Sequence, residues 1–369
     1  MMQTDNSISP NQLVLAAFML MLSPALRLFP SAAAAWAGKG AWLSALLALP
    51  AAAAYLWLAR RGALLRREGE GLCELIARAA PGRAGRMALA VLALWLCVYA
   101  GFVLRSGADR FLVTVYPNTP AAFFILTMAG AALWAAYAPL HQAARTVKLL
   151  FPAVGLILAL VLLSSLGRLR AENLLPLSLD DAPGVLAGSL AALDVLLWSF
   201  YAAAMLLPGI RKGSISYRRL LPGLAAGCAL LSLMSAEIVG SFGAPLAAEL
   251  SWPFFSLVRN LVFFRSIERV EALVVALWVF PDFLIVSLFL RAARRALTLS
   301  LSARFPRAGA SRALPGLCAA ASAAFALLSA PDAKSLQLLS DTVIPGVSLF
   351  FALVFFPLLL GLGKRRGTI

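Results

Sequence analysis

The sequence predicts an all-α integral membrane protein with ten transmembrane helices. Apolar residues make up 62% of the 369-residue chain and charged residues only 13%, about half of the charged share of a typical soluble domain. The apolar residues also cluster in blocks of about 17–25, the length that a helix needs to cross a hydrocarbon core of roughly 30 Å. Segments of alternating polarity, typical of a membrane β-barrel, are missing. Because so few polar residues cannot cover a soluble globule, soluble and disordered chains are excluded.

Ten apolar blocks follow one another along the chain, and proline or glycine marks many of the joints between them. The first block is expected to be a retained helix, because residues 1–26 hold no Lys or Arg and a signal peptide begins with a basic region. The fourth and ninth blocks are the least hydrophobic because alanine dilutes them. The predicted spans are 11–29, 40–59, 87–105, 121–139, 147–166, 185–207, 220–241, 271–290, 314–330 and 343–362.

The distribution of basic residues predicts that both termini face the cytoplasm. With that orientation, 22 of the 32 Lys and Arg residues fall in inner segments and nine in outer segments, as the positive-inside rule requires. The net charge of +16 is therefore spread over many loops. Since no single basic face collects it, nucleic-acid binding is excluded, and the basic residues are expected to meet the headgroups of the lipid bilayer.

The segment 242–270 is too polar and too interrupted to cross the membrane. It nevertheless holds two apolar runs, Trp252 to Phe255 and Leu261 to Phe264, which arginines punctuate. This pattern predicts a short amphipathic helix at the outer interface. Such a helix would act as an interfacial anchor or as an extracellular gate over a substrate vestibule.

Two aspartates are expected near the middle of the membrane. At the helical rise of about 1.5 Å per residue, Asp282 lies about 16 Å into the eighth span and Asp194 about 15 Å into the sixth. Ionisable groups at such depth are costly and usually functional. Both carboxylates should therefore face protein or water rather than lipid.

Four other charged residues are expected closer to the outer ends of their spans. Arg27 should extend its guanidinium outward to the interface. Arg105 and Asp109 are four residues apart and should pair on one helical face. Glu237 lies near the outer end of the seventh span by the same count.

Two spans are predicted to be interrupted at depth. In the first, Pro24 lacks a backbone donor and disfavours helix at Ser23. In the sixth, the run from Asp194 to Tyr201 is a polar and aromatic interruption. The eighth span also holds a proline, Pro281, directly before Asp282, but a proline alone often only kinks a membrane helix. Non-helical backbone in a membrane is tolerated only where it lines a cavity. Interrupted helices 1 and 6 fit two inverted five-helix repeats, whose broken helices meet at a midplane ligand site.

Several short segments occur in an order and spacing typical of one protein family. They are Ile8 to Leu13 before a span ending Leu28-Phe29-Pro30, then Glu172-Asn173-Leu174-Leu175-Pro176, Trp252 to Arg259, Ile267 to Ala272, and Ala276 to Val279. In these segments the chain resembles the spore germination permeases, the B subunits of Ger-type germinant receptors. The resemblance covers about residues 8–295.

The resemblance implies a ten-helix amino acid/polyamine/organocation transporter fold in the inner membrane of the endospore. It also implies that the protein senses a small germinant, usually an amino acid, together with an A subunit and a lipoprotein C subunit. The implied pocket residues are Ser23, Pro24, Tyr99, Trp198, Ser199, Pro281 and Asp282.

The chain departs from that family inside the implied pocket. Ser23-Pro24 stands where the family usually has Gly-Thr, and Trp198-Ser199 where it has Gly-Glu. Loss of glycine removes the easiest close approach of backbone to a ligand, and Trp198 narrows the space. Asp282 adds a carboxylate that the family does not usually place there. The resemblance therefore does not carry over the identity of the ligand.

Three functions stay open from the sequence: a germinant sensor, a proton-coupled transporter of an amino acid or organic cation, and a structural receptor subunit. In the first Asp194 or Asp282 would meet a ligand ammonium, and in the second one of them would carry the proton. An enzyme is not expected, since the chain has no nucleotide loop and no nucleophile with a base. The single histidine and four dispersed cysteines also predict no metal, cofactor or disulfide.

Overall fold

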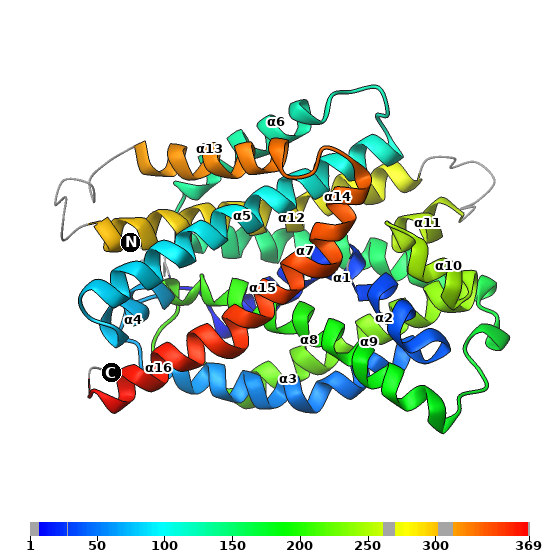
Figure 1. Cartoon of the computed structure of the whole chain (residues 1–369), viewed down its shortest axis with the longest axis horizontal. Coiled ribbons are helices and arrows are strands. Elements are labelled where there is room, and N and C mark those ends of the chain that lie inside the picture. Colours follow the sequence, from blue (N-terminus) through cyan, green and yellow to red (C-terminus); the bar gives the residue numbers. More distant parts are fainter. Residues whose placement is uncertain (1–6, 28, 261–269, 302–312, 368–369) are drawn as a thin grey trace, which may run out of the picture.

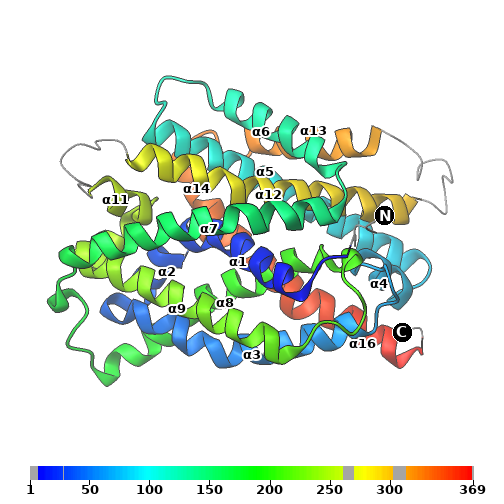
Figure 2. The same cartoon turned by 180° about the vertical axis from the view of Figure 1, so that it is seen from behind.

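The computed structural model describes residues 7–27, 29–260, 270–301 and 313–367, and in them the chain is a bundle of long helices (Figures 1 and 2). Every predicted apolar block overlaps a helical segment, which confirms an all-α membrane protein. The helices are α1 (Pro10–Arg27), α2 (Phe29–Ala37), α3 (Ala41–Leu64), α4 (Leu72–Ala79), α5 (Arg83–Thr114), α6 (Ala121–Ala136), α7 (Leu140–Ser165), α8 (Ala182–Ala204), α9 (Tyr217–Phe242), α10 (Ala244–Glu249), α11 (Pro253–Arg259), α12 (Val270–Leu301), α13 (Ala313–Leu328), α14 (Ala333–Leu338), α15 (Ile344–Phe350) and α16 (Phe356–Arg365).

Six helical segments within the described ranges are long and apolar enough to cross a membrane. The helices α6 and α13 are shorter and equally apolar. Many large apolar side chains on the outside of the bundle are exposed, for example Trp134 and Leu149, as expected of surfaces that face lipid. The protein is therefore a multi-pass membrane protein, and the count of ten crossings stays a prediction.

The core of the bundle is the pair α5 and α12, which pack along much of their length. The helices α6 and α13 cover one side of this pair, whereas α3, α8 and α9 form a second group on the other side (Figures 1 and 2). Helix α1 lies between the two groups and touches α7, α8, α9 and α12. Side chains from both groups can therefore meet at α1.

Small residues allow the helices of the bundle to approach closely. A Cβ added at Gly188 of α8 would lie 2.5 Å from the Ser44 hydroxyl of α3, and one added at Gly101 of α5 would lie 2.5 Å from the Ser322 carbonyl of α13. Four alanines on one face of α3 are likewise fully buried. Helix pairs in membranes commonly meet through such residues, because lipid supplies no hydrophobic drive between helices.

The predicted interruptions of the sixth span at Asp194 to Tyr201 and of the first span at Ser23 and Pro24 are both wrong. Helix α8 is regular from Ala182 to Ala204, so Asp194 to Tyr201 are helical. That run lacks Gly and Pro, and the Ser199 hydroxyl bonds the carbonyl of Leu196 within the helix. Helix α1 continues through Ser23 and Pro24 to Arg27, as membrane helices tolerate proline.

The tenth span instead contains irregular helix that the sequence did not predict. Two π-helical segments, η7 (Leu339–Val343) and η8 (Phe351–Phe355), separate α14, α15 and α16. Segments of this kind occur frequently at functional sites, because they shift the register of the side chains on either side.

The segment that was predicted to be an interfacial helix packs against the bundle. Helix α11 buries Phe254 and Phe255, whose rings lie 5.6 and 6.2 Å from the ring of Trp278 on α12. Residues 261–269, which include the second apolar run, lie outside the described residues. The described part therefore packs against the first turns of α12, and its position at the membrane interface stays a prediction.

We expect that Gly101→Ala destabilises the protein, because its new methyl group would collide with a backbone carbonyl that cannot move independently. Overpacking of this kind costs about 1–3 kcal/mol of unfolding free energy. Gly316→Ala on α13 is the matched control, since a Cβ there meets no atom within 4 Å. Thermal unfolding in mild detergent would measure both variants, and equal stabilities would contradict the close α5–α13 contact.

Candidate ligand-binding site

The buried Asp282 carboxylate joins three helices at the centre of the bundle. Asp282 of α12 is 1% exposed, forms an ion pair with Arg110 of α5, and accepts a hydrogen bond from the Ser23 hydroxyl of α1. Gly107, one turn before Arg110, leaves room for the carboxylate, because a Cβ there would lie 3.4 Å from it. The charge of Asp282 is therefore balanced inside the protein by Arg110.

The sequence analysis did not identify Arg110 as a site residue, because the third span was predicted to end at residue 105. Helix α5 runs nine residues further, to Thr114, which moves Arg110 from an outer loop into the bundle. Its guanidinium also lies 5.5 and 5.6 Å from the rings of Trp252 and Phe255. One signal in the sequence did indicate a longer helix. The predicted pairing of Arg105 with Asp109 requires helix as far as residue 109, next to Arg110.

Tyr99 and Trp198 lie together in an aromatic cluster. Their ring centroids are 4.2 Å apart, and Phe289 of α12 lies 5.5 and 5.3 Å from them. Trp95 and Tyr201 extend the cluster on α5 and α8. Both predicted pocket residues are therefore buried against each other, and the indole nitrogen of Trp198 lacks a hydrogen-bond partner among the described residues.

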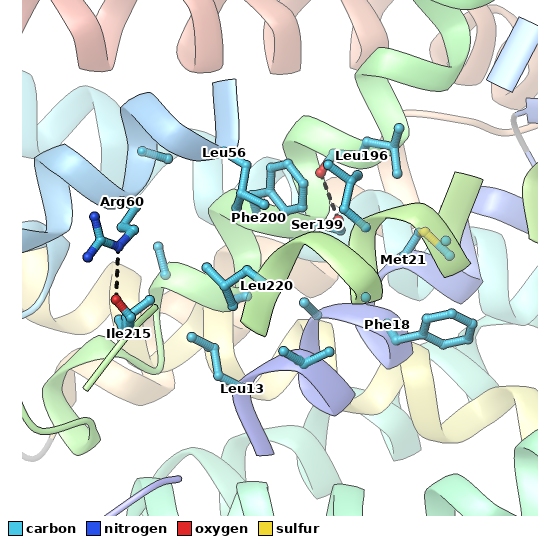
Figure 3. A pocket seen from close by; sticks show the side chains of 18 of the residues that line it. Leu13, Phe18, Met21, Leu56, Arg60, Leu196, Ser199, Phe200, Ile215 and Leu220 are labelled. Atoms are coloured by element: carbon cyan, nitrogen blue, oxygen red, sulfur yellow. Dashed lines mark hydrogen bonds between the residues drawn. The ribbon is translucent and has the colours of Figure 1, made fainter. Parts of the chain in front are cut away.

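Ser199 lies on another face of α8 and lines a separate cavity of about 120 Å³ (Figure 3). The walls of this cavity are almost entirely apolar, with Leu13, Phe18 and Leu220 among them. The hydroxyl of Ser199 donates to the carbonyl of Leu196 at 2.7 Å. This space could hold an apolar group but offers no free polar partner from Ser199.

Asp194 faces a different cavity, which has a volume of about 260 Å³ and lies between α2, α8 and the tenth span. The side chains of Ser340 and Asp341 in η7 line the same cavity. Asp194 is 5% exposed, and its Oδ1 atom has no hydrogen-bond partner in the described part of the chain. Burying a carboxylate oxygen without a hydrogen-bond donor costs free energy. A ligand in the cavity could supply the donor that Oδ1 lacks.

The structure therefore divides the eight predicted residues among different environments. Asp282 forms the buried ion pair with Arg110 and accepts a hydrogen bond from Ser23, whereas Tyr99 and Trp198 belong to the aromatic cluster. Pro24 and Pro281 are buried within regular helix. Ser199 and Asp194 line two distinct cavities, on either side of α8.

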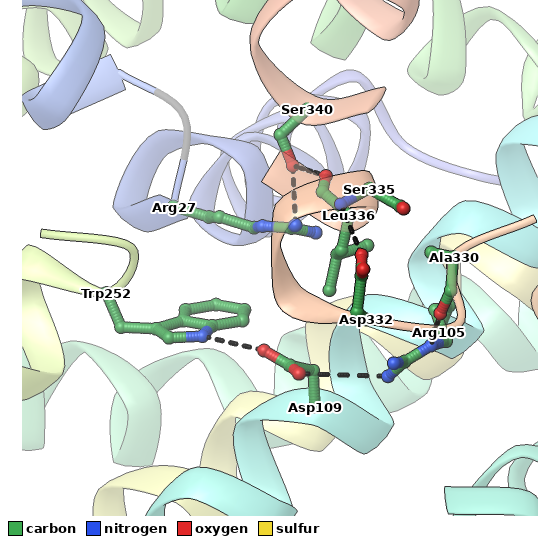
Figure 4. A network of polar contacts seen from close by, with 9 residues as sticks. All are labelled: Arg27, Arg105, Asp109, Trp252, Ala330, Asp332, Ser335, Leu336 and Ser340. Carbon is green, nitrogen blue, oxygen red and sulfur yellow. Dashed lines mark hydrogen bonds and ion pairs between the residues drawn. The ribbon is translucent and has the colours of Figure 1, made fainter. Parts of the chain in front are cut away.

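A second polar network, which the sequence only partly revealed, surrounds Arg27 (Figure 4). The prediction that Arg27 extends to the interface is wrong, because its side chain is buried and donates to the Ser340 hydroxyl. The guanidinium lies 4.7 and 4.9 Å from the rings of Phe102 and Trp252, a cation–π geometry. These partners come from α5, the α10–α11 connection and η7, which no sequence spacing brings together.

The predicted pair of Arg105 and Asp109 is confirmed in the same network. Their side chains are 3.7 Å apart, and Asp109 also accepts a hydrogen bond from the Trp252 indole at 3.1 Å. Arg105 donates to the Ala330 carbonyl at 2.8 Å. Nearby, hydrogen bonds from Ser335 to the Asp332 cap of α14 hold the pKa of that carboxyl below its ordinary value.

Glu237 is more deeply buried than its predicted place near a helix end suggests. It is fully enclosed on α9 and accepts a hydrogen bond from Ser165 of α7, while its Oε1 atom has no partner among the described residues. No group of three or more potential metal ligands occurs in the described ranges.

A family model described as spore germination protein matches residues 7–327. The chain belongs to the spore germination protein family. The structure of the chain also resembles the crystal structure of MhsT in complex with L-phenylalanine. The TM-score is 0.61, and the sequence identity is 15% over 97% of this chain and 95% of that chain. At that identity the likeness shows the fold alone. No curated protein matches the chain.

We expect that Asp282→Asn destabilises the protein strongly, because it leaves the Arg110 charge buried without a partner. Breaking a buried pair costs about 3–5 kcal/mol. Arg110→Gln should cost a similar amount, and the double variant should lose clearly less than the sum of the two. Unfolding free energies in detergent, arranged as a double-mutant cycle, would measure the coupling.

Asp180→Asn is the control for this cycle, since Asp180 is exposed before α8 and its loss should change stability by less than about 0.5 kcal/mol. Strict additivity of the Asp282 and Arg110 variants would show that the ion pair does not hold the helices.

Proposed function

We propose that the protein is the permease-like membrane subunit of a spore germinant receptor and that it senses a small germinant, with an amino acid as the leading candidate. Membership of the spore germination protein family supports this setting. The similar fold of MhsT, described in complex with L-phenylalanine, supports a small ligand that carries an amino group.

The unpartnered Oδ1 of Asp194 is the single observation that carries the proposal. A ligand ammonium in the adjoining cavity would donate the missing hydrogen bond and balance the charge. Asp341 lines the same space and offers a second carboxylate, whereas Asp282 is already neutralised by Arg110. We therefore assign the binding of the amine to Asp194. Asp282 and Ser23 would instead hold the surrounding helices in position.

The remaining predicted residues take supporting roles in this proposal. Trp198 follows Asp194 by one turn of α8 and packs against Tyr99 of α5, so this ring pair would support α8 beside the cavity. Pro24, Pro281 and Ser199 shape α1, α12 and α8 without contacting the ammonium. The germinant would thus sit between α2, α8 and the tenth span.

Sensing requires that the germinant bind one conformation of the receptor more tightly than another. The cavity lies where three separate elements meet, so closing it on a ligand would move α2 and η7 relative to α8. The A subunit and the lipoprotein C subunit of the receptor would then respond to that movement and start germination of the endospore.

We expect that Asp194→Asn weakens binding of amine-bearing germinants by roughly ten- to a hundredfold, because a hydrogen bond to a charged group contributes about 1.5–3 kcal/mol. The measurement is calorimetric titration of the purified protein in nanodiscs with a panel of amino acids. Each amino acid is compared with its decarboxylated amine and its deaminated acid. The amine should still bind, and the deaminated acid should not.

Asp180→Asn removes the same charge from the exposed segment before the same helix and should leave every affinity unchanged. Spores that carry either variant together with the partner subunits provide the physiological readout. An unchanged germinant dose curve with Asp194→Asn would refute the assignment of the amine.

A proton-coupled transporter of an amino acid or organic cation is the second candidate. A buried carboxylate without a partner, as found at Asp194, is the group expected to carry the coupled proton. Uptake of labelled amino acid into proteoliposomes, with and without a proton gradient, separates the two functions. Gradient-dependent accumulation by the isolated subunit would favour transport, and saturable binding without accumulation would favour sensing.

A further inference from the structure

A large cavity near α16 shares no lining residue with the proposed germinant site. It has a volume of about 500 Å³ and lies between α3, α4, α8 and α16, at the end of the bundle that carries the C-terminus (Figures 1 and 2). This volume lies within the range of small-molecule sites, about 300–1,000 Å³. None of its lining residues takes part in the Asp194 cavity or in the Arg27 network.

The cavity opens sideways through the surface of the bundle. Leu58 of α3 is 48% exposed and Gly361 of α16 is exposed, and both line the cavity. Deeper in, its walls are apolar side chains such as Phe200, Leu72 and Phe356. In a membrane protein such an opening between two outer helices faces acyl chains, so an apolar chain can enter without crossing water.

Two cations stand at the rim of this cavity without an acidic neighbour. Arg61 lies in the last turn of α3 and Lys364 in the last turn of α16, and both line the cavity and are exposed. Neither forms an ion pair among the described residues, and Arg61 lies 3.7 Å above the ring of Trp57. The nearby acids Glu70 and Glu74 are engaged by other arginines. The lining residues include no Asp or Glu.

A buried hydroxyl completes the set of polar groups. Tyr201 of α8 lines the cavity and is 5% exposed, yet its hydroxyl has no hydrogen-bond partner in the described residues. By contrast, the hydroxyl of Tyr55 on α3, which also lines the cavity, donates to the Ala352 carbonyl in η8 at 2.9 Å. The cavity thus offers a hydroxyl without a hydrogen-bond partner and two cations without an ion pair among the described residues.

We propose that this cavity binds one phospholipid with an anionic headgroup. An acyl chain fills the apolar interior, the phosphate lies between Arg61 and Lys364, and an ester carbonyl accepts from Tyr201. Basic pockets between membrane helices are suited to such headgroups, and the surrounding bilayer supplies them. The bound lipid would tie α16 to α3 and α8, and the Tyr55–Ala352 bond links that position to the irregular tenth span.

The test is lipid retention by the purified full chain, measured by native mass spectrometry after exchange into phosphatidylglycerol or phosphatidylcholine. The unmodified protein should retain one phosphatidylglycerol in preference to phosphatidylcholine. Removing a basic contact near the membrane should weaken retention about fivefold. The double variant Arg61→Gln with Lys364→Gln should therefore lower phosphatidylglycerol retention by roughly thirtyfold.

Matched variants separate the cavity from general surface charge. Arg218→Gln with Arg219→Gln removes the same charge from exposed positions at the start of α9 and should leave retention unchanged. Gly361→Phe keeps both cations and adds a ring at a residue that lines the cavity, where a Cβ meets no atom within 4 Å. It should lower retention of the lipid while the thermal stability in lipid-free detergent stays constant.

Equal retention of the two lipids would overturn the proposal, as would equal losses in the two charge variants. Full retention by Gly361→Phe would place the lipid on the outer surface and also contradict it. Preferential retention of a free fatty acid or of a second copy of the chain would show a different occupant. None of these results bears on Asp194, so the germinant proposal is tested independently.

Discussion

The ion pair between Arg110 and Asp282 holds the centre of the bundle together. It joins the two helices with the most extensive mutual packing, α5 and α12, and the Ser23 hydroxyl attaches α1 to the same carboxylate. In a membrane neither charge can turn to water, so each must find its partner within the protein. The positions of α1, α5 and α12 are therefore coupled, and the elements around them are placed relative to that core.

Because Asp282 is balanced internally, the site chemistry moves to groups that are not balanced. Asp194 retains an oxygen without a donor beside a cavity, on a helix that is otherwise tightly packed. The contrast between the two aspartates comes from one basic residue, Arg110, which reaches Asp282 and not Asp194. Two aspartates with the same predicted depth thus have different roles, one in holding helices together and one proposed in binding.

The tenth span connects the proposed sites. Its first π-helical segment presents Ser340 to Arg27 and Asp341 to the Asp194 cavity, and its second accepts the Tyr55 hydrogen bond next to the large apolar cavity. Irregular helix has backbone groups that neighbouring side chains can satisfy in more than one arrangement. A conformational change at either cavity would therefore act on the same helical segment.

The sequence by itself determined that the protein is a helical membrane protein and which family it belongs to. These properties depend on the length of the apolar blocks, the charge content and the order of short motifs. It also determined the Arg105–Asp109 pair, since residues four apart on a helix must be neighbours. Only the tertiary structure decided that Arg110 balances Asp282, that Arg27 turns inward to Ser340, and that α8 runs unbroken past Asp194. Each of these depends on groups far apart in the chain, Arg27 and Ser340 by 313 residues, and no local spacing specifies which of them helix packing brings into contact.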